Sequence, residues 1–157
     1  MRILGIDPGQ SGGFALVGDD KKPETYTFKK ATEWDTFSAI RSAVEFVDFI
    51  YIERVHAFPG QGVSSTFKFG QHYGFLRASL VACGIPWDDV SPATWQRSLR
   101  CLTKGDKNVT KSKAQQLWPT LIITHAIADA LLIAEWGRRS RLNLNEKEMV
   151  EHGNGKH

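Results

Sequence analysis

The sequence predicts a single α/β domain of 157 residues. Two apolar runs, residues 1–7 and 48–55, have the length and composition of buried strands. Two longer segments, residues 32–47 and 64–83, repeat their apolar residues at helical spacing. A hydrophobic content of 41% and a charged content of 24% are typical of a globular chain with a buried core. Strands and helices are therefore both expected along one chain.

Three strands are expected before the first helix. The run at residues 1–7 leads into a turn rich in glycine and proline. Residues 13–17 and 24–28 follow as a second and a third strand, and the third alternates polar with aromatic or β-branched residues. Because the links between these strands are short, we expect an antiparallel meander. Thr32 is the expected N-cap of the helix at residues 32–47.

The long helix at residues 64–83 is expected to start at a serine cap and to stop at Gly84. Its apolar face would consist of Phe67, Phe75, Leu76 and Leu80. Gly70 and Gly74 lie four residues apart, and small residues at this spacing let another helix approach closely. That helix would belong either to the same chain or to a second copy in a dimer.

One strand and three helices are expected in the C-terminal half. The strand covers residues 85–90, and the first helix starts at Pro92 with Ser91 as its N-cap. The other two helices cover residues 110–118 and 124–139. A polar, basic loop connects the first of these helices to the second.

Composition argues against several classes of protein. No run approaches the roughly 20 apolar residues of a membrane-spanning helix, and we expect no secretion signal. The two cysteines, Cys83 and Cys101, lack the spacing of a metal site and are expected to be free thiols in the cytoplasm. Residues 1–142 are expected to form the domain, and residues 143–157 a polar, disordered tail.

Positive charge is concentrated in the C-terminal half, although the formal net charge is only +3. From Arg100 to Arg141, eight lysines and arginines stand against three acids. This excess favours a polyanionic partner such as a nucleic acid. A solvated surface with scattered lysines is the alternative explanation.

Three carboxylates, those of Asp7, Glu53 and Asp129, stand where a soluble fold rarely places them. They follow or interrupt apolar segments. Each alone has another explanation, because Asp7 could cap its turn and Glu53 could pair with Arg54. If all three converge, their mutual repulsion requires bound divalent cations. Oxygen ligands of this kind favour Mg²⁺ or Mn²⁺, and two such ions could activate water and stabilise a leaving phosphate oxygen.

Four short segments together resemble a known protein family. They lie at residues 6–9, 51–53, 91–95 and 128–134. In order and spacing they resemble the RuvC-type Holliday junction resolvases, particularly the phage-encoded branch, and the resemblance spans residues 1–139. It implies an RNase H-like fold, in which helices flank a five-stranded mixed sheet. It also implies a homodimer with two active sites.

The function that the resemblance implies is that of a crossover junction endodeoxyribonuclease. Such an enzyme resolves four-way junctions and other branched DNA by paired, metal-dependent nicking that leaves 5′-phosphates. Asp7, Glu53 and Asp129 match the metal-binding acids of the family. The resemblance further implies two Mg²⁺ ions per active site, for which Mn²⁺ could substitute, and a place in the host cytoplasm if a phage encodes the chain.

One position departs from the pattern of the family. The family carries a fourth ligand about one helical turn before the last aspartate, where this chain has Ala126. His125 could face the same site, as a metal ligand or as a general base. Alternatively, Ala126 replaces an aspartate, which would leave a junction-binding protein without activity. His125 could also be an ordinary core or capping residue.

The DNA contacts expected from the sequence are phosphate contacts by Lys104, Lys107, Lys111 and Lys113. Phe58 lies in a loop rich in glycine and could stack on unpaired bases at a branch point, or cover the core. An RNase H-fold nuclease for another nucleic acid is a rival hypothesis. An ATP-binding protein of the actin and sugar-kinase type shares the turn after the first strand, but such folds need two large lobes.

Overall fold

The fold is built on one mixed sheet of five strands, in the order β3-β2-β1-β4-β5. The computed structural model describes residues 1–19, 22–56, 60 and 62–153. The strands are β1 (Ile3–Asp7), β2 (Gly13–Val17), β3 (Glu24–Thr27), β4 (Phe49–Glu53) and β5 (Trp87–Val90). The first three strands pair antiparallel, whereas β1 pairs parallel with β4, and β4 pairs parallel with β5. The predicted meander and the predicted five-stranded mixed sheet are confirmed.

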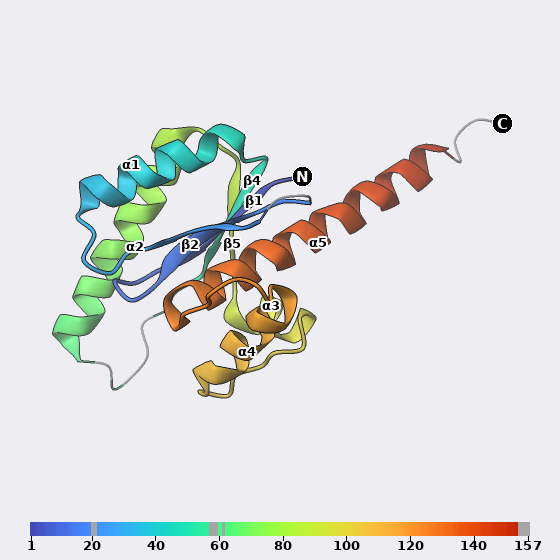
Figure 1. Ribbon diagram of the computed structural model, residues 1–157. Coiled ribbons are helices and arrows are strands. Elements are labelled where there is room, and N and C mark those ends of the chain that lie inside the picture. Colours follow the sequence, from blue (N-terminus) through green and yellow to red (C-terminus); the bar gives the residue numbers. More distant parts are fainter. Residues whose placement is uncertain (20–21, 57–59, 61, 154–157) are drawn as a thin grey trace.

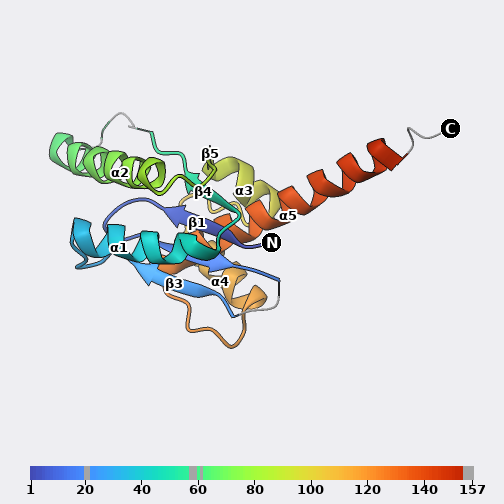
Figure 2. The same cartoon turned by 90° about the horizontal axis from the view of Figure 1, so that it is seen from above.

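Helices cover both faces of this sheet (Figures 1 and 2). On one face lie α1 (Glu33–Ala43) and α2 (Val63–Cys83), with a short 3₁₀ turn at Val44–Phe46 after α1. The other face carries α5 (His125–Gly153), flanked by α3 (Pro92–Ser98) and α4 (Lys107–Leu117). The predicted α/β class, a sheet flanked by helices, is therefore confirmed.

Each face of the sheet has its own hydrophobic core. Alternate residues of the central strands point to opposite faces, so Leu4 and Ile6 pack under α2 while Ile3 packs under α5. Both central strands are buried on both faces, as their continuous apolar runs predict.

The contact between α5 and β1 depends on Gly5, because the two backbones touch there. A Cβ atom at Gly5 would lie 2.3 Å from the carbonyl oxygen of Ala130 and 2.4 Å from the backbone nitrogen of Ala134. Further along the helix, a Cβ atom at Gly137 would lie 2.3 Å from the ring of Tyr51. These small residues fix the height of α5 above the sheet, and with it the position of Asp129.

Most predicted helix ends are confirmed by their capping interactions. The Thr32 hydroxyl accepts a hydrogen bond from the backbone N–H of Asp35, which completes a capping box. Gly84 ends α2 in the left-handed conformation, with φ of 69°. Ser91 caps α3 ahead of Pro92, as predicted.

Several sequence predictions about the helices are wrong. The residue before α2 is Gly62, which makes no side-chain capping bond, so the predicted serine cap is not formed. Phe67 does not face the core and is 66% exposed. The fourth helix starts at Lys107, three residues earlier than predicted, because Asp106 accepts a hydrogen bond from the backbone N–H of Asn108 and caps it.

The last helix does not end at Arg139, because α5 continues to Gly153 and runs past the edge of the sheet (Figure 1). Gly137 does not stop it, since this glycine is where the helix touches Tyr51. The expected domain boundary after residue 142 stays a prediction. Within the ranges given above, no helix is long and apolar enough to cross a membrane.

Candidate active site

The three unusual carboxylates come together at one end of the sheet. Asp7 and Glu53 end the neighbouring parallel strands β1 and β4, whose preceding residues Ile6 and Ile52 are paired. Asp129 comes from the first turns of α5, directly before the residue that touches Gly5. All three line a cleft of about 480 Å³, which His125 and Lys107 also line. The predicted convergence of the acids is therefore observed.

Glu53 is held by a hydrogen bond from a buried tryptophan. The indole N–H of Trp95, a residue with no exposed surface, donates a hydrogen bond of 2.8 Å to Oε2 of Glu53. Burial raises the pKa of Glu53 to about 7, and the Trp95 hydrogen bond opposes that rise. Arg54 does not pair with Glu53, because it binds Asp89 instead. The ion-pair explanation of Glu53 is therefore excluded.

The other two acids are also in settings that disfavour their charged forms. Burial raises the pKa of Asp7 well above its usual range, and the negative charges of Glu53 and Asp129 raise it further. Burial likewise raises the pKa of Asp129, while a side-chain hydrogen bond from Thr110 and then the positive charge of Lys107 oppose the rise. The positive charge of Lys107 thus lowers the pKa of all three acids.

One oxygen in this cleft has no partner. Oδ1 of Asp129 is buried and accepts no hydrogen bond from any residue that the structure describes. A buried carboxylate oxygen without a partner costs free energy unless a cation meets it. Asp7 and Glu53 line the same cleft, and carboxylate oxygens such as theirs are the ligands that Mg²⁺ and Mn²⁺ prefer. Among the described residues, however, no three acidic, histidine or cysteine side chains are yet close enough to hold one ion.

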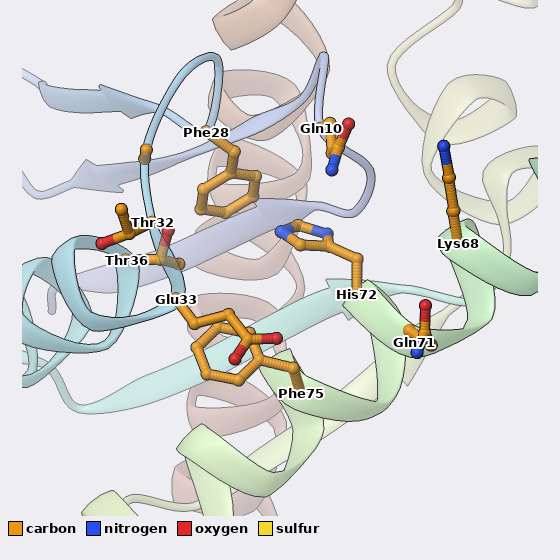
Figure 3. Close-up of a pocket in the computed structure, with 10 residues that line it drawn as sticks. Gln10, Phe28, Thr32, Glu33, Thr36, Lys68, Gln71, His72 and Phe75 are labelled. Atoms are coloured by element: carbon orange, nitrogen blue, oxygen red, sulfur yellow. The ribbon is translucent and has the colours of Figure 1, made fainter.

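The turn after Asp7 is fixed from the other side of the sheet. The backbone N–H of Gly9 donates a hydrogen bond of 3.1 Å to Nδ1 of His72. The side chain of His72 projects from α2 (Figure 3). The φ of Gly9 is +109°, and a Cβ atom there would lie 2.8 Å from the ring of Phe69. The backbone N–H of Gly12 closes the turn onto the Gly9 carbonyl at 3.0 Å. His72 and Phe69 therefore hold the segment that carries Asp7.

His125, not Ala126, lines the carboxylate cleft. His125 begins α5 and is exposed. Its electrostatic effect lowers the pKa of Asp129. Ala126 lines a neighbouring cavity of about 710 Å³ beside β3, which His125 lines as well. Of His125 and Ala126, the histidine is thus the one placed to act on the acids.

The predicted DNA-contacting residues do not all lie at the cleft. Lys107 does, at the first position of α4. Lys113 lines a different cavity, together with Arg100. Lys104 is exposed in the turn before α4, and Phe58 lies outside the described residues.

Sequence reasoning missed several residues that shape the site. Trp95 belongs to a segment that carries the family resemblance, yet nothing in the sequence points to its bond with Glu53. His72 and Phe69 reach Gly9 from more than 55 residues away, so their contacts follow from the packing of α2 alone. Lys107 was expected to bind phosphate, and its place beside the acids was not predicted.

At the sequence level, no family model and no curated protein matches this chain. Solved structures do match. RuvC from Thermus thermophilus superposes with a TM-score of 0.62 and 18% identity, covering 91% of this chain and 97% of RuvC. The same RuvC in complex with a Holliday junction substrate matches with a TM-score of 0.62 and 17% identity, over 89% of this chain and 96% of that chain.

A resolvase from Fowlpox virus, in complex with substrate Holliday junction DNA, is also similar, with a TM-score of 0.48 and 16% identity. It covers 90% of this chain and 99% of the resolvase. The low identities limit the conclusion to architecture. The RuvC match extends over nearly the whole of both chains and includes the mixed sheet and its flanking helices. The chain therefore has the RNase H-like fold of RuvC.

Proposed function

We propose that this protein is a structure-selective endonuclease that resolves four-way junctions and other branched DNA by metal-dependent paired nicking. The observation that carries the proposal is the cleft where Asp7, Glu53 and Asp129 converge around a carboxylate oxygen without a partner. The RuvC fold supports it, because RuvC has been seen with a Holliday junction substrate.

Asp7, Glu53 and Asp129 are the residues that would hold the cations, the first two from the ends of β1 and β4 and the third from α5. Bound Mg²⁺, or Mn²⁺ in its place, supplies water activation and neutralises charge on the leaving phosphate oxygen. The Trp95 indole would orient Glu53 through its hydrogen bond to Oε2. Lys107 would stabilise the added negative charge of the reacting phosphate.

His125 is proposed as the fourth ligand or as the general base of the reaction. It lines the cleft and is exposed to the solvent from which an attacking water would come. If this role is right, His125→Ala lowers nicking strongly while junction binding persists. If His125→Ala nicks at the wild-type rate, His125 is neither a required metal ligand nor the general base.

The direct test is a cleavage panel of labelled four-way junctions, flaps, RNA–DNA hybrids and linear duplexes in Mg²⁺, Mn²⁺ or EDTA. We expect paired nicks in the four-way junction, only with metal, and much weaker cleavage of linear duplex. Preferential cleavage of hybrids would instead favour an RNase H-fold nuclease for another substrate. Absence of cleavage of every substrate would overturn the nuclease proposal.

A second candidate function is junction binding without catalysis. Among the described residues, no group of three acidic, histidine or cysteine side chains is arranged to hold a metal ion, and Ala126 offers no ligand. In this case the protein binds junctions tightly and leaves them intact in Mg²⁺ and Mn²⁺. Nicking that appears only in Ala126→Asp would establish this reading, whereas native nicking would exclude it.

Phosphate contacts are proposed for the four lysines of the α4 region, Lys104, Lys107, Lys111 and Lys113. Each contact with B-DNA contributes about −0.9 to the slope of log K against log salt concentration. Single alanine variants should therefore each reduce the slope by about one, without changing preference among junction sequences. A variant with an unchanged slope does not make such a contact.

A homodimer is proposed through an exposed apolar stripe on α2, formed by Val63, Phe67, Gly70, Gly74 and Val81. These residues lie on one side of the helix by their spacing. Val63, Phe67 and Val81 are 87%, 66% and 68% exposed, and nothing lies within 4 Å of a Cβ atom at Gly70 or Gly74. The internal packing considered for these glycines is thus not observed.

Sedimentation tests this dimer. The wild type should sediment as a dimer, Phe67→Glu with Val81→Glu as a monomer, and Ile122→Glu as a dimer. Ile122 is a matched control, because it is 88% exposed and lies outside the stripe. A wild-type monomer, alone and on junction DNA, would exclude the dimer.

A further inference from the structure

A second cavity lies on the far side of the turn that carries Asp7, between α1 and α2. It has a volume of about 330 Å³ and is shown in Figure 3. Gln10 lines both this cavity and the carboxylate cleft, so the two spaces meet at one residue of the turn. A strand bound across the carboxylates would therefore pass the mouth of this cavity.

The size of the cavity suits one small planar group. Its volume is at the lower end of the roughly 300–1,000 Å³ of small-molecule sites, too little for a base pair with its backbones. One wall is aromatic: the rings of His72 and Phe28 meet edge to face at 5.0 Å, and Phe75 follows His72 at 6.4 Å. His72 and Phe75 are only half-buried, so part of each ring is open for contact.

Polar groups surround this aromatic wall. Gln10 and Gln71 carry amides that can both donate and accept hydrogen bonds. Glu33 extends from the start of α1 toward α2 and can only accept when ionised (Figure 3). Lys68 stands at the rim on α2 and can meet a phosphate. Aromatic faces, amide edges and a cation at the rim together match an unpaired nucleotide.

We propose that this cavity receives a single unpaired nucleobase of the branched substrate, next to the phosphate that lies at the carboxylates. The proposal rests on the proposed function, because it needs a branched nucleic acid in the cleft. Glu33 favours bases with an exocyclic amino group, so adenine, cytosine and guanine are preferred to thymine at this position. The site thus selects branch points, where bases can leave the stack at least cost.

The cavity is joined to the catalytic turn through His72. The ring of His72 forms part of the cavity wall, and its Nδ1 holds the backbone N–H of Gly9, two residues after Asp7. A base against this ring therefore contacts the residue that positions the turn. Occupancy of the cavity would favour the arrangement of Asp7 that the bound strand needs.

The test removes the base and its protein partners separately and together. Junctions carry an abasic site at each nucleotide within two of the branch point in turn, and binding is measured in Ca²⁺ or EDTA. The pocket variant is Glu33→Ala with Gln71→Ala, both exposed positions. The matched control is Glu45→Ala with Gln116→Ala, exposed residues of the same types outside the cavity.

We expect an abasic site at one nucleotide to weaken wild-type binding by about 5- to 150-fold, the range for one stacked base. The same abasic site should cost the pocket variant much less, and the control variant as much as the wild type. Thymine at that nucleotide should weaken wild-type binding relative to adenine, and Glu33→Gln should reduce this difference.

Two outcomes overturn the proposal in distinguishable ways. If the wild type binds intact junctions tightly but no abasic position matters, or if the pocket variant shows the full abasic loss, the cavity does not hold a base and the proposed function stands. If the wild type does not bind junctions more tightly than duplex, the proposed function is wrong, and the proposal that the cavity holds a nucleobase is wrong with it.

Discussion

Two carboxylates on α5, those of Asp129 and Glu135, lie six residues apart and differ in their hydrogen-bond partners. Glu135 is 5% exposed, and both its oxygens accept hydrogen bonds from arginines: Arg138 at 2.9 and 3.2 Å and Arg139 at 2.6 Å. Asp129 faces two other acids, and its Oδ1 has no partner. If the proposed function is right, the Oδ1 atom of Asp129 is the oxygen that meets a cation or substrate, whereas the oxygens of Glu135 are already satisfied by arginines.

The largest expected effect separates these two acids. Asp129→Asn should lower single-turnover nicking of a four-way junction by roughly 1,000-fold, since a metal ligand supplies several kcal/mol of transition-state stabilisation. Without metal the variant should be more stable than the wild type, because it removes a buried charge.

Glu135→Gln is the matched variant. It should lose about 1–3 kcal/mol in urea unfolding, because two arginines lose a charged partner, while nicking by the folded protein stays within a few-fold of the wild type. Equal losses of nicking in both variants would contradict the distinction between the two acids.

The second effect concerns how α5 is held over the sheet. Gly5→Ala places a Cβ atom against the backbone of α5 and should cost about 3 kcal/mol or more. Since Asp7 and Asp129 are then displaced, nicking should fall by roughly 100-fold. Gly18→Ala meets only the flexible side chain of Arg2, at 3.0 Å, and is the control. If the stability and nicking of Gly5→Ala match those of Gly18→Ala, the close contact is not needed.

A third effect is the pH dependence of stability in EDTA. The folded protein raises the pKa of Glu53 from its ordinary 4.5 to about 7, so between these values the folded state keeps a proton that the unfolded chain releases. Stability therefore falls as pH rises from about 4.5 to about 7, by at most roughly 3 kcal/mol from this residue. In Glu53→Gln the side-chain oxygen can still accept the Trp95 hydrogen bond, but there is no carboxyl group whose ionisation destabilises the fold.

Urea unfolding at pH 5 and pH 8 measures this. The unfolding free energy of Glu53→Gln minus that of the wild type should be larger at pH 8 than at pH 5. The same stability difference at both pH values would show that the Glu53 proton is not coupled to folding. Added Mg²⁺ at pH 8 should offset the cost in the wild type, because it binds the ionised carboxylates.

The smallest expected effect is at the turn after Asp7. His72→Ala leaves the Gly9 N–H without its acceptor and should lower nicking by about 10-fold, the lower range for residues that orient metal ligands. His72→Asn supplies an oxygen near the position of Nδ1 and should restore most of the rate. Failure of asparagine to improve on alanine would show that the Gly9 hydrogen bond does not position the turn.

The sheet could be predicted from the sequence because its signals are local. The apolar runs around Ile3 and Ile50 and the glycine turn before β2 act within a few residues of themselves. The starts of α2 and α4 were less predictable, because Gly62 gives no side-chain signal and Asp106 stands in a polar run that also suits a loop. The length of α5 was underestimated because Gly137 suggests an end, whereas it provides a contact.

For the site, the three acids could be predicted because each contradicts its apolar surroundings. Trp95 could not be assigned to Glu53, since an apolar indole in a short helix is ordinary core until its N–H partner is known. The same holds for His72, whose role depends on the angle at which α2 crosses the sheet. Residues that hold the acids in place thus become visible only in three dimensions.

Whether Asp129 binds a cation is tested directly by thermal unfolding with and without Mg²⁺ at pH 8 for the wild type, Asp129→Asn and Glu135→Gln. At 100-fold excess over Kd, a cation that binds only the folded state adds about 2.7 kcal/mol, and each kcal/mol is worth about 2–4 °C at this chain length. We expect a rise in Tm for the wild type and for Glu135→Gln, and none for Asp129→Asn. An equal rise in all three proteins, or none in the wild type, would contradict it.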